Sequence, residues 1–233
     1  MASAKASATE VAAIGIFADL PDSSLEECAR LAVRRTLPAG RIVFSQGAPG
    51  ARFHALVSGS IRISQAGRDG GQALTRFVAP GKPFGGFGLF VDGCYPGEAT
   101  AVADAVELSW SEAHFRQLME RCPTIATNLL ALAARRLAEL QDRLREIATQ
   151  PAEQRIANVL LRLADQNGRR LDDGSVEIAS PLARRDIAAI SATALYTASR
   201  IMARWERSGI VASAGRRVSI RSFADLTRIA DEG

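Results

Sequence analysis

The sequence predicts an α+β protein made of three consecutive parts, and three observations support this fold class. Short β-type segments alternate with glycines between Thr36 and Trp110. Apolar residues then recur every three or four positions along one segment from Pro123 to about Thr149, which indicates a single long helix. After Pro151, short helical and strand patterns alternate, as in a compact α/β module.

The N-terminal part is expected to form a small β sandwich or barrel. Its candidate strands are apolar or β-branched, and glycines between them can form tight turns. The segments are RIVFSQG, HALVSGSIRIS, ALTRFVAPG and ATAVADAVELSW. An amphipathic helix over 22–35 is expected to precede them, with Asp22 or Ser23 as its cap and Leu25 and Cys28 on its inner face.

The long helix carries a heptad pattern that predicts a two-fold homodimer. Leu129 and Leu132 can face the β domain, which leaves the heptad seam free for a twin helix. The alternative is a helix that packs wholly within its own chain. Pro151 ends the helix, so the expected domains are 1–121, 122–150 and 151–233. The seam consists of Leu130, Ala133, Leu137, Leu140, Leu144 and Ile147.

The C-terminal part is predicted to contain two helices, 184–190 and 194–208, separated by a turn at residues 191–193. A helix over 152–166, a polar loop over 167–173 and a strand over 176–178 are expected before them. Two strands, 210–212 and 217–220, should follow around a turn, and Ser222 with Asp225 forms a capping pattern for a last helix. The expected core residues are Ile156, Val159, Leu160, Leu163, Ile187, Ala188, Ile190, Ala198, Ile201, Met202 and Trp205.

This arrangement indicates a winged helix-turn-helix that binds double-stranded DNA. From Ala183 to Arg221 the chain has eight arginines and only two acidic residues. A second helix with an arginine-bearing outer face fits the major groove, where Arg200 could reach guanine. Arg184 and Arg185 suit phosphates, and Arg216 and Arg217 suit a wing. Tyr196, Thr197 and Ser199 could make shorter contacts or pack against thymine methyls. The expected DNA contacts are Arg184, Arg185, Thr193, Leu195, Tyr196, Thr197, Ser199, Arg200, Arg204, Arg216 and Arg217.

Other functional classes find little support in the sequence. Three widely spaced cysteines indicate neither a disulfide framework nor a zinc site, and they cannot supply the four thiolates of an iron–sulfur cluster. The sequence contains neither a nucleophile elbow nor a phosphate-binding loop, so it does not suggest an enzyme. No apolar run could span a membrane, and no secretory signal begins the chain, so a cytoplasmic location is expected. The remaining alternative is a ligand-sensing β module whose helical tail regulates a partner protein.

From Ile16 to Ile229 the chain resembles the CRP/FNR superfamily of bacterial regulators. The motifs are LPAGRIVFSQGAPG, LVSGSIRIS and APGKPFGGFGLF in the β part, ARRLAELQDRL and EQRIANVLLRLA in the helices, and RRDIAAISATALYTASRIMARWERSGIV in the DNA module. The resemblance implies a cyclic-nucleotide-binding-like jelly roll, a dimerisation helix and a winged helix-turn-helix. It also implies a palindromic operator and contact with RNA polymerase.

The cyclic AMP site of that superfamily is altered here. The acidic position after the FG of the roll is Gly86, the Arg-Thr positions read Gly97-Glu98, and the adenine-binding positions read Leu140-Gln141. Without the arginine fork, and with Glu98 adding a like charge, cyclic AMP binding in the usual mode is not expected. The expected effector pocket comprises Phe84, Gly86, Phe87, Leu89, Phe90, Tyr95, Gly97, Glu98, Leu140 and Gln141.

The stretches GFGLFVDGCYPGEATA and ALYTASR are similar to the nitric-oxide-responsive NnrR/DNR branch, which is thought to sense through haem. An axial ligand would then be needed, and His54 is the candidate, although a core role for it is the stronger interpretation. His114 is expected on the surface, and methionine or cysteine ligands stay open.

In the reading helix Tyr196 replaces a common glutamate, and Ala192 stands where relatives carry a turn glycine. We expect an effector to shift the seam near Leu140 and rotate the DNA modules about residues 149–151.

Overall fold

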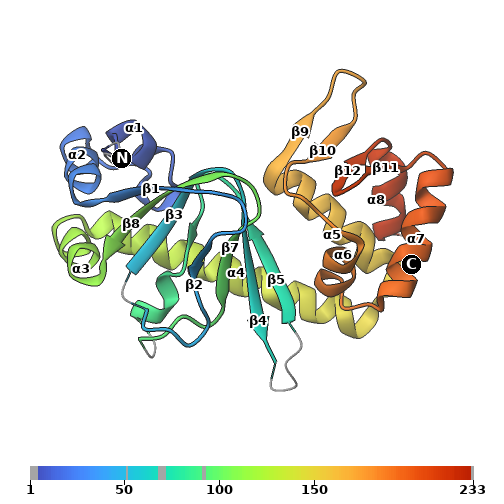
Figure 1. The fold of residues 1–233 in the computed structure, drawn as a ribbon, viewed down its shortest axis with the longest axis horizontal. Coiled ribbons are helices and arrows are strands. Elements are labelled where there is room, and N and C mark those ends of the chain that lie inside the picture. Colours follow the sequence, from blue (N-terminus) through green and yellow to red (C-terminus); the bar gives the residue numbers. More distant parts are fainter. Residues whose placement is uncertain (1–4, 51, 68–71, 91–92, 232–233) are drawn as a thin grey trace. The chain divides into compact units, whose positions relative to one another are not determined.

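The α+β fold with an N-terminal roll and a C-terminal helix-turn-helix is confirmed by a computed structural model, which describes residues 5–50, 52–67, 72–90 and 93–231 (Figure 1). The chain divides into two compact units, residues 1–72 with 76–138 and residues 139–233 with 73–75. The division falls within the long helix, ahead of the predicted border at Pro151. The two units are described separately.

The first unit contains two antiparallel four-stranded sheets. One has the order β1 (Val33–Leu37), β8 (Ala105–Ser111), β3 (Arg52–Ser58) and β6 (Pro83–Phe84). The other has the order β2 (Ile42–Phe44), β7 (Glu98–Ala101), β4 (Ile61–Ala66) and β5 (Gln72–Val78). Between them lies a core that includes Leu37, Phe44, Leu56, Ile61, Val78, Phe84, Tyr95, Ala99 and Ala101.

Short helices cover one side of the roll and form a second core with it. They are α1 (Ala8–Ala12), η1 (Gly15–Phe17), α2 (Asp22–Leu31), η2 (Gly86–Leu89) and α3 (Glu112–Arg121). The expected helix over 22–35 is too long: it ends at Leu31, and Val33–Leu37 pairs with β8 instead. The predicted cap at Asp22 or Ser23 is also wrong, because the N-cap residue is Pro21, which forms no side-chain hydrogen bond to the helix. Helix α1 was not expected, although Ser7 and Glu10 form a capping box there.

The long helix α4 (Pro123–Thr149) has the predicted bounds. Its first turns belong to the first unit, where Ile125 is buried and Leu129 and Leu132 pack against the second core, as expected. Arg136 Nη2 donates to the carbonyl oxygen of Pro83 at 3.0 Å. The last turns of α4 belong to the second unit.

The second unit contains α5 (Ala152–Asn167), α6 (Arg184–Ile190), α7 (Leu195–Arg207) and α8 (Phe223–Asp231). Its sheet has the order β11 (Val211–Ala214), β12 (Arg217–Ile220), β10 (Val176–Ile178) and β9 (Gly168–Arg170). The expected polar loop over 167–173 therefore contains an unpredicted strand, β9, which pairs with β10. All of the expected core residues of this unit are buried. The Ser222–Asp225 cap is present.

Candidate nucleic-acid interface and interior of the roll

Helices α6 and α7 meet at a tight turn that fixes the start of α7. The Thr193 amide donates to Ala188 O at 2.9 Å, and Ser191 Oγ donates to Ile187 O at 2.8 Å. Ala192 has φ +49°, the left-handed conformation that an alanine adopts only at a cost. Ala192 is therefore a strained residue at the turn position where the resembling family carries glycine.

The turn is held in place by two arginines that sequence reasoning missed. Arg155, on α5, donates through Nε to Ser191 O (2.8 Å), through Nη1 to Gln150 O (2.6 Å) and through Nη2 to Ala192 O (3.0 Å). Arg143, on the last part of α4, donates to Ile190 O at 3.1 Å. These cations satisfy carbonyls at the C-terminal end of α6, where unpaired carbonyls and the helix dipole favour positive charge. No local pattern points to this role, because both arginines look like solvated helix residues in the sequence.

The outer face of α7 carries the predicted DNA-contact residues. Arg200 and Arg204 are exposed, Tyr196 and Leu195 are strongly exposed, and Thr193, Thr197 and Ser199 are half-buried. Within the described residues, Arg185, Arg200, Arg207 and Arg217 form no ion pair. We call these four the unpaired arginines.

The other predicted arginines are engaged within the chain. Arg184 forms an ion pair with Glu206 at 2.5 Å and is half-buried, so a phosphate would have to compete with Glu206 for its guanidinium. Arg204 pairs with Glu153, which also accepts a hydrogen bond from Trp205 Nε1. Arg216 lies 3.9 Å from Asp186. The acidic partners come from other elements of the fold, which the spacing of the arginines did not reveal.

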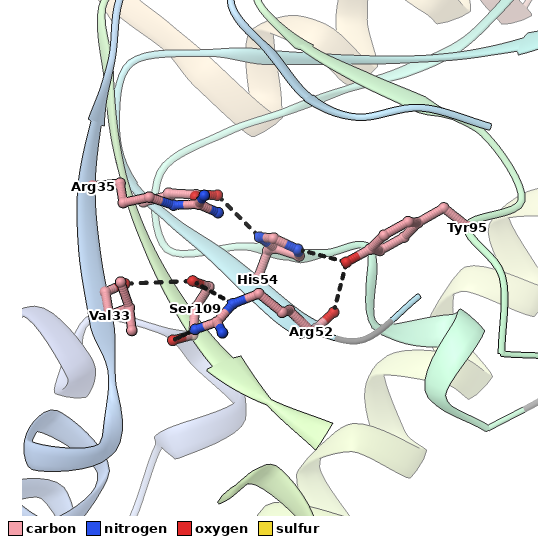
Figure 2. Close-up of polar contacts among 7 residues, drawn as sticks. Val33, Arg35, Arg52, His54, Tyr95 and Ser109 are labelled. Atoms are coloured by element: carbon pink, nitrogen blue, oxygen red, sulfur yellow. Dashed lines mark hydrogen bonds and ion pairs between the residues drawn. The ribbon is translucent and has the colours of Figure 1, made fainter. Parts of the chain in front are cut away.

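Inside the roll, His54 is at the centre of a buried polar network (Figure 2). Its Nδ1 lies 3.0 Å from Glu107 Oε2, and its Nε2 lies 3.0 Å from the Tyr95 hydroxyl. Arg35 pairs with Glu107 at 2.6 Å. Burial lowers the pKa of His54, and the hydrogen bond to Glu107 opposes this only in part. The neutral ring therefore donates from Nδ1 to Glu107 and accepts from Tyr95 at Nε2.

Aromatic rings fill the space around this network. Phe44 stacks on Tyr95 with ring centroids 3.9 Å apart, and Phe84 lies 5.2 Å from the His54 ring. His54 is 1% exposed, and both of its ring nitrogens are engaged. It does not fit the role of an axial haem ligand and is a satisfied core residue. His114 is exposed, as expected.

The expected effector residues of the first unit are divided between its two cores. Phe84 and Tyr95 lie in the core between the sheets, whereas Leu89 lies in the second core with the helices. Phe90 is exposed beside Arg116, and the side chain of Phe87 is outside the described part of the chain. Leu140 and Gln141 are exposed on α4.

The positions of the cyclic AMP clamp are closed by neighbouring atoms. A Cβ atom added to Gly86 would lie 2.3 Å from the Phe53 ring, and one added to Gly97 would lie 2.8 Å from Ser64 O. Glu98 is half-buried at the start of β7. It accepts a hydrogen bond from Thr100 on the face of β7 opposite the core residues Ala99 and Ala101.

Three further observations limit the chemistry of the described residues. They contain no group of three or more histidine, cysteine or acidic side chains arranged to hold a metal ion. Among them, no helix combines the length and the apolar character needed to cross a lipid bilayer. Burial raises the pKa of the Cys28 thiol to about 12, so this cysteine is not a ready nucleophile.

Comparison with known proteins defines the class. A cyclic nucleotide-binding domain model matches residues 34–122, and a Crp-like helix-turn-helix domain model matches residues 154–229. The chain is thus a DNA-binding transcriptional regulator with a cyclic-nucleotide-binding-like domain. It is 30% identical to the Cyclic AMP receptor protein of Thermus thermophilus over 197 residues, which cover 84% of this chain and 88% of that protein. The chain belongs to the CRP/FNR family.

Other similarities agree with this assignment. The chain is 26% identical over 218 residues to a CRP-like cAMP-activated global transcriptional regulator of Mycobacterium tuberculosis, covering 94% of this chain and 97% of that protein. The fold is similar to that of FixK2 from Bradyrhizobium japonicum, with a TM-score of 0.72 and 22% identity over 85% of this chain and 96% of that one. The Mycobacterium tuberculosis relative is a transcriptional regulator and not an enzyme, in line with the prediction, and the likeness to FixK2 concerns the fold. The narrower resemblance to the NnrR/DNR branch stays a prediction.

Proposed function

We propose that this regulator is a cytoplasmic homodimer that binds palindromic double-stranded DNA through α7. The observation that supports this most directly is the set of unpaired arginines on and around a helix-turn-helix whose reading helix has a fully formed inner core. Arginine forks recognise guanine edges and phosphates in this geometry. Arg200 is the proposed base reader, and Arg185, Arg207 and Arg217 are the proposed phosphate contacts. RNA polymerase is the proposed protein partner.

The proposed dimer contact is the seam on α4. Leu130, Leu137, Leu140, Leu144 and Ile147 are between 47% and 71% exposed, although all are large and apolar. Leu129 and Leu132 of the same helix already pack against the first unit, whereas these five side chains stay exposed. A second copy of the same helix would cover this stripe and place two reading helices about one helical turn of DNA apart, ~34 Å.

We propose that the effector is not cyclic AMP bound in the usual mode, although one relative is named as cAMP-activated and another as a cyclic AMP receptor protein. The support is steric and electrostatic. Gly86 and Gly97 offer no charged group, and neighbouring atoms occupy the space that a longer side chain would need. A nitric oxide response through haem would need a ligand other than His54. Titration calorimetry with cyclic AMP should give no heat of binding at concentrations that saturate an intact site.

The test of DNA binding uses fluorescence anisotropy with duplexes selected by the purified protein from a randomised library. Three phosphate contacts per protomer predict that log K falls with log salt with a slope of about −5. A protein-docking module would bind no duplex, or would bind without such a slope.

The dimer is tested by Leu140→Glu, with Ala138→Glu as the matched control at an exposed position next to the seam. A charge at Leu140 should convert the dimer to a monomer in analytical ultracentrifugation and weaken DNA binding by at least tenfold, because each half-site is then bound separately. The control should change neither. A dimeric Leu140→Glu variant with normal binding would contradict the assigned seam.

A further inference from the structure

The reading helix begins with two exposed apolar side chains. Leu195 is 52% exposed and Tyr196 is 77% exposed. The apolar residues of α7 that face inward are buried, namely Ala198, Ile201, Met202 and Trp205. Leu195 and Tyr196 are therefore not part of the inner stripe. Single exposed apolar residues are common on protein surfaces, but an adjacent pair in the first turn of a reading helix is not accounted for by the packing of this unit.

The spacing places the pair beside the proposed base reader. On an α-helix, residues four apart lie on the same face, so Tyr196 adjoins Arg200 and Leu195 adjoins Ser199. In a helix-turn-helix the first turns of the second helix approach the base edges. The turn that precedes α7 is fixed by the bonds from Arg155 to Ser191 O and Ala192 O, so the first turn of α7 has a defined position.

The chemistry of these side chains restricts what they can read. Leu195 has no donor or acceptor, and Tyr196 offers one hydroxyl on a large ring, so neither can form a two-pronged hydrogen bond to a base. In the major groove the apolar group available to them is the C5-methyl of thymine. The surrounding unpaired arginines supply the positive charge that brings this surface to DNA rather than to an apolar protein partner.

We propose that Leu195 and Tyr196 read thymine methyl groups, so that each half-site contains a thymine next to the guanine contacted by Arg200. This inference rests on the proposed function, namely DNA binding through α7. It makes the first turn of α7 a determinant of sequence specificity through apolar contact. Arg200 remains the polar reader one turn further along the helix.

The test removes the methyl group and leaves base pairing intact. Duplexes selected by the wild-type protein are synthesised with each thymine replaced in turn by deoxyuridine, and dissociation constants are measured by fluorescence anisotropy. Loss of one buried methyl should weaken binding about fourfold, and loss in both half-sites about 16-fold. The sensitive positions should lie beside the selected guanine.

Leu195→Ala and Tyr196→Ala should each reduce the thymine-to-deoxyuridine ratio at the sensitive positions towards one. Both side chains are exposed, so these variants should keep the wild-type circular dichroism melt. Phe223→Ala is the matched control, because Phe223 is also an exposed apolar residue of this unit but lies on α8. It should leave the ratio unchanged.

The possible outcomes separate the two proposals. Binding with a steep salt slope but without any deoxyuridine-sensitive position would overturn this inference alone. A ratio that Leu195→Ala and Tyr196→Ala leave intact would also overturn it. Failure of the wild-type protein to bind any duplex would overturn the proposed function, and this inference with it.

Discussion

The turn between α6 and α7 offers a sharp test of how the second unit is held together. Arg155→Met keeps the length and the apolar stem of the side chain but removes all three hydrogen bonds to Gln150, Ser191 and Ala192. A hydrogen bond from a charged donor contributes about 1.5–3 kcal/mol where it is shielded from water. The bonds to Gln150 and Ser191 are partly buried and the bond to Ala192 is exposed, so we count only two at the lower value. The expected loss is about 3 kcal/mol.

Urea unfolding gives the change in free energy, and hydrogen exchange locates it. The amide of Thr193 should exchange faster in Arg155→Met, because its acceptor Ala188 O belongs to the turn that the arginine stabilises. Arg170→Met is the control, since Arg170 is exposed on β9. If Arg155→Met unfolds within about 0.5 kcal/mol of the wild type and its turn amides exchange at the same rate, the arginine does not hold the turn.

Two further predictions concern strain and protonation. Ala192→Gly should raise the free energy of unfolding by roughly 1 kcal/mol, measured by thermal melting, because glycine adopts φ +49° without steric cost; a lower melting temperature would contradict this. For His54, the folded-state pKa lies below the unfolded value of about 6.5, so the unfolded state binds the proton first and stability falls as pH drops below that value. His54→Gln should lose this dependence below about pH 6.5, where Arg35 and Arg52 also disfavour a charged ring. If the wild type and His54→Gln show parallel pH profiles of the free energy of unfolding in urea, this prediction is refuted.

Local sequence patterns predicted the fold correctly where a segment's conformation depends on neighbouring residues in the chain. Helix α4 was bounded correctly because Pro123 starts it and Pro151 follows it, and the apolar period of α6 and α7 identified their shared core. The same reasoning failed at Val33–Leu37. There the helical period of α2 continued into residues whose conformation depends on pairing with β8, more than sixty residues further along the chain. Strand β9 was missed for a similar reason, since its exposed residues show no apolar alternation.

For the candidate site, the sequence predicted which types of residue gather there better than it predicted their interaction partners. The sequence showed where arginines gather, but not that Arg184 is held by Glu206 or that Arg155 binds the turn. Such partners are separated in sequence and meet only when helices pack. The converse holds in the roll, where closeness in sequence did not mean closeness in space. Leu89 and Tyr95 are close in sequence, yet they lie in different cores.

The altered clamp position of the roll follows from its packing and not from one substitution alone. The Phe53 ring fills the space that a side chain at Gly86 would need, and it stacks on Phe115 with centroids 4.0 Å apart. A glutamate at position 86 would therefore have to displace a ring that is already buried against α3. Because overpacking a filled core costs free energy, an acidic side chain at position 86 would destabilise the roll. The glycine at position 86 is therefore matched to the packing of the Phe53 ring against α3.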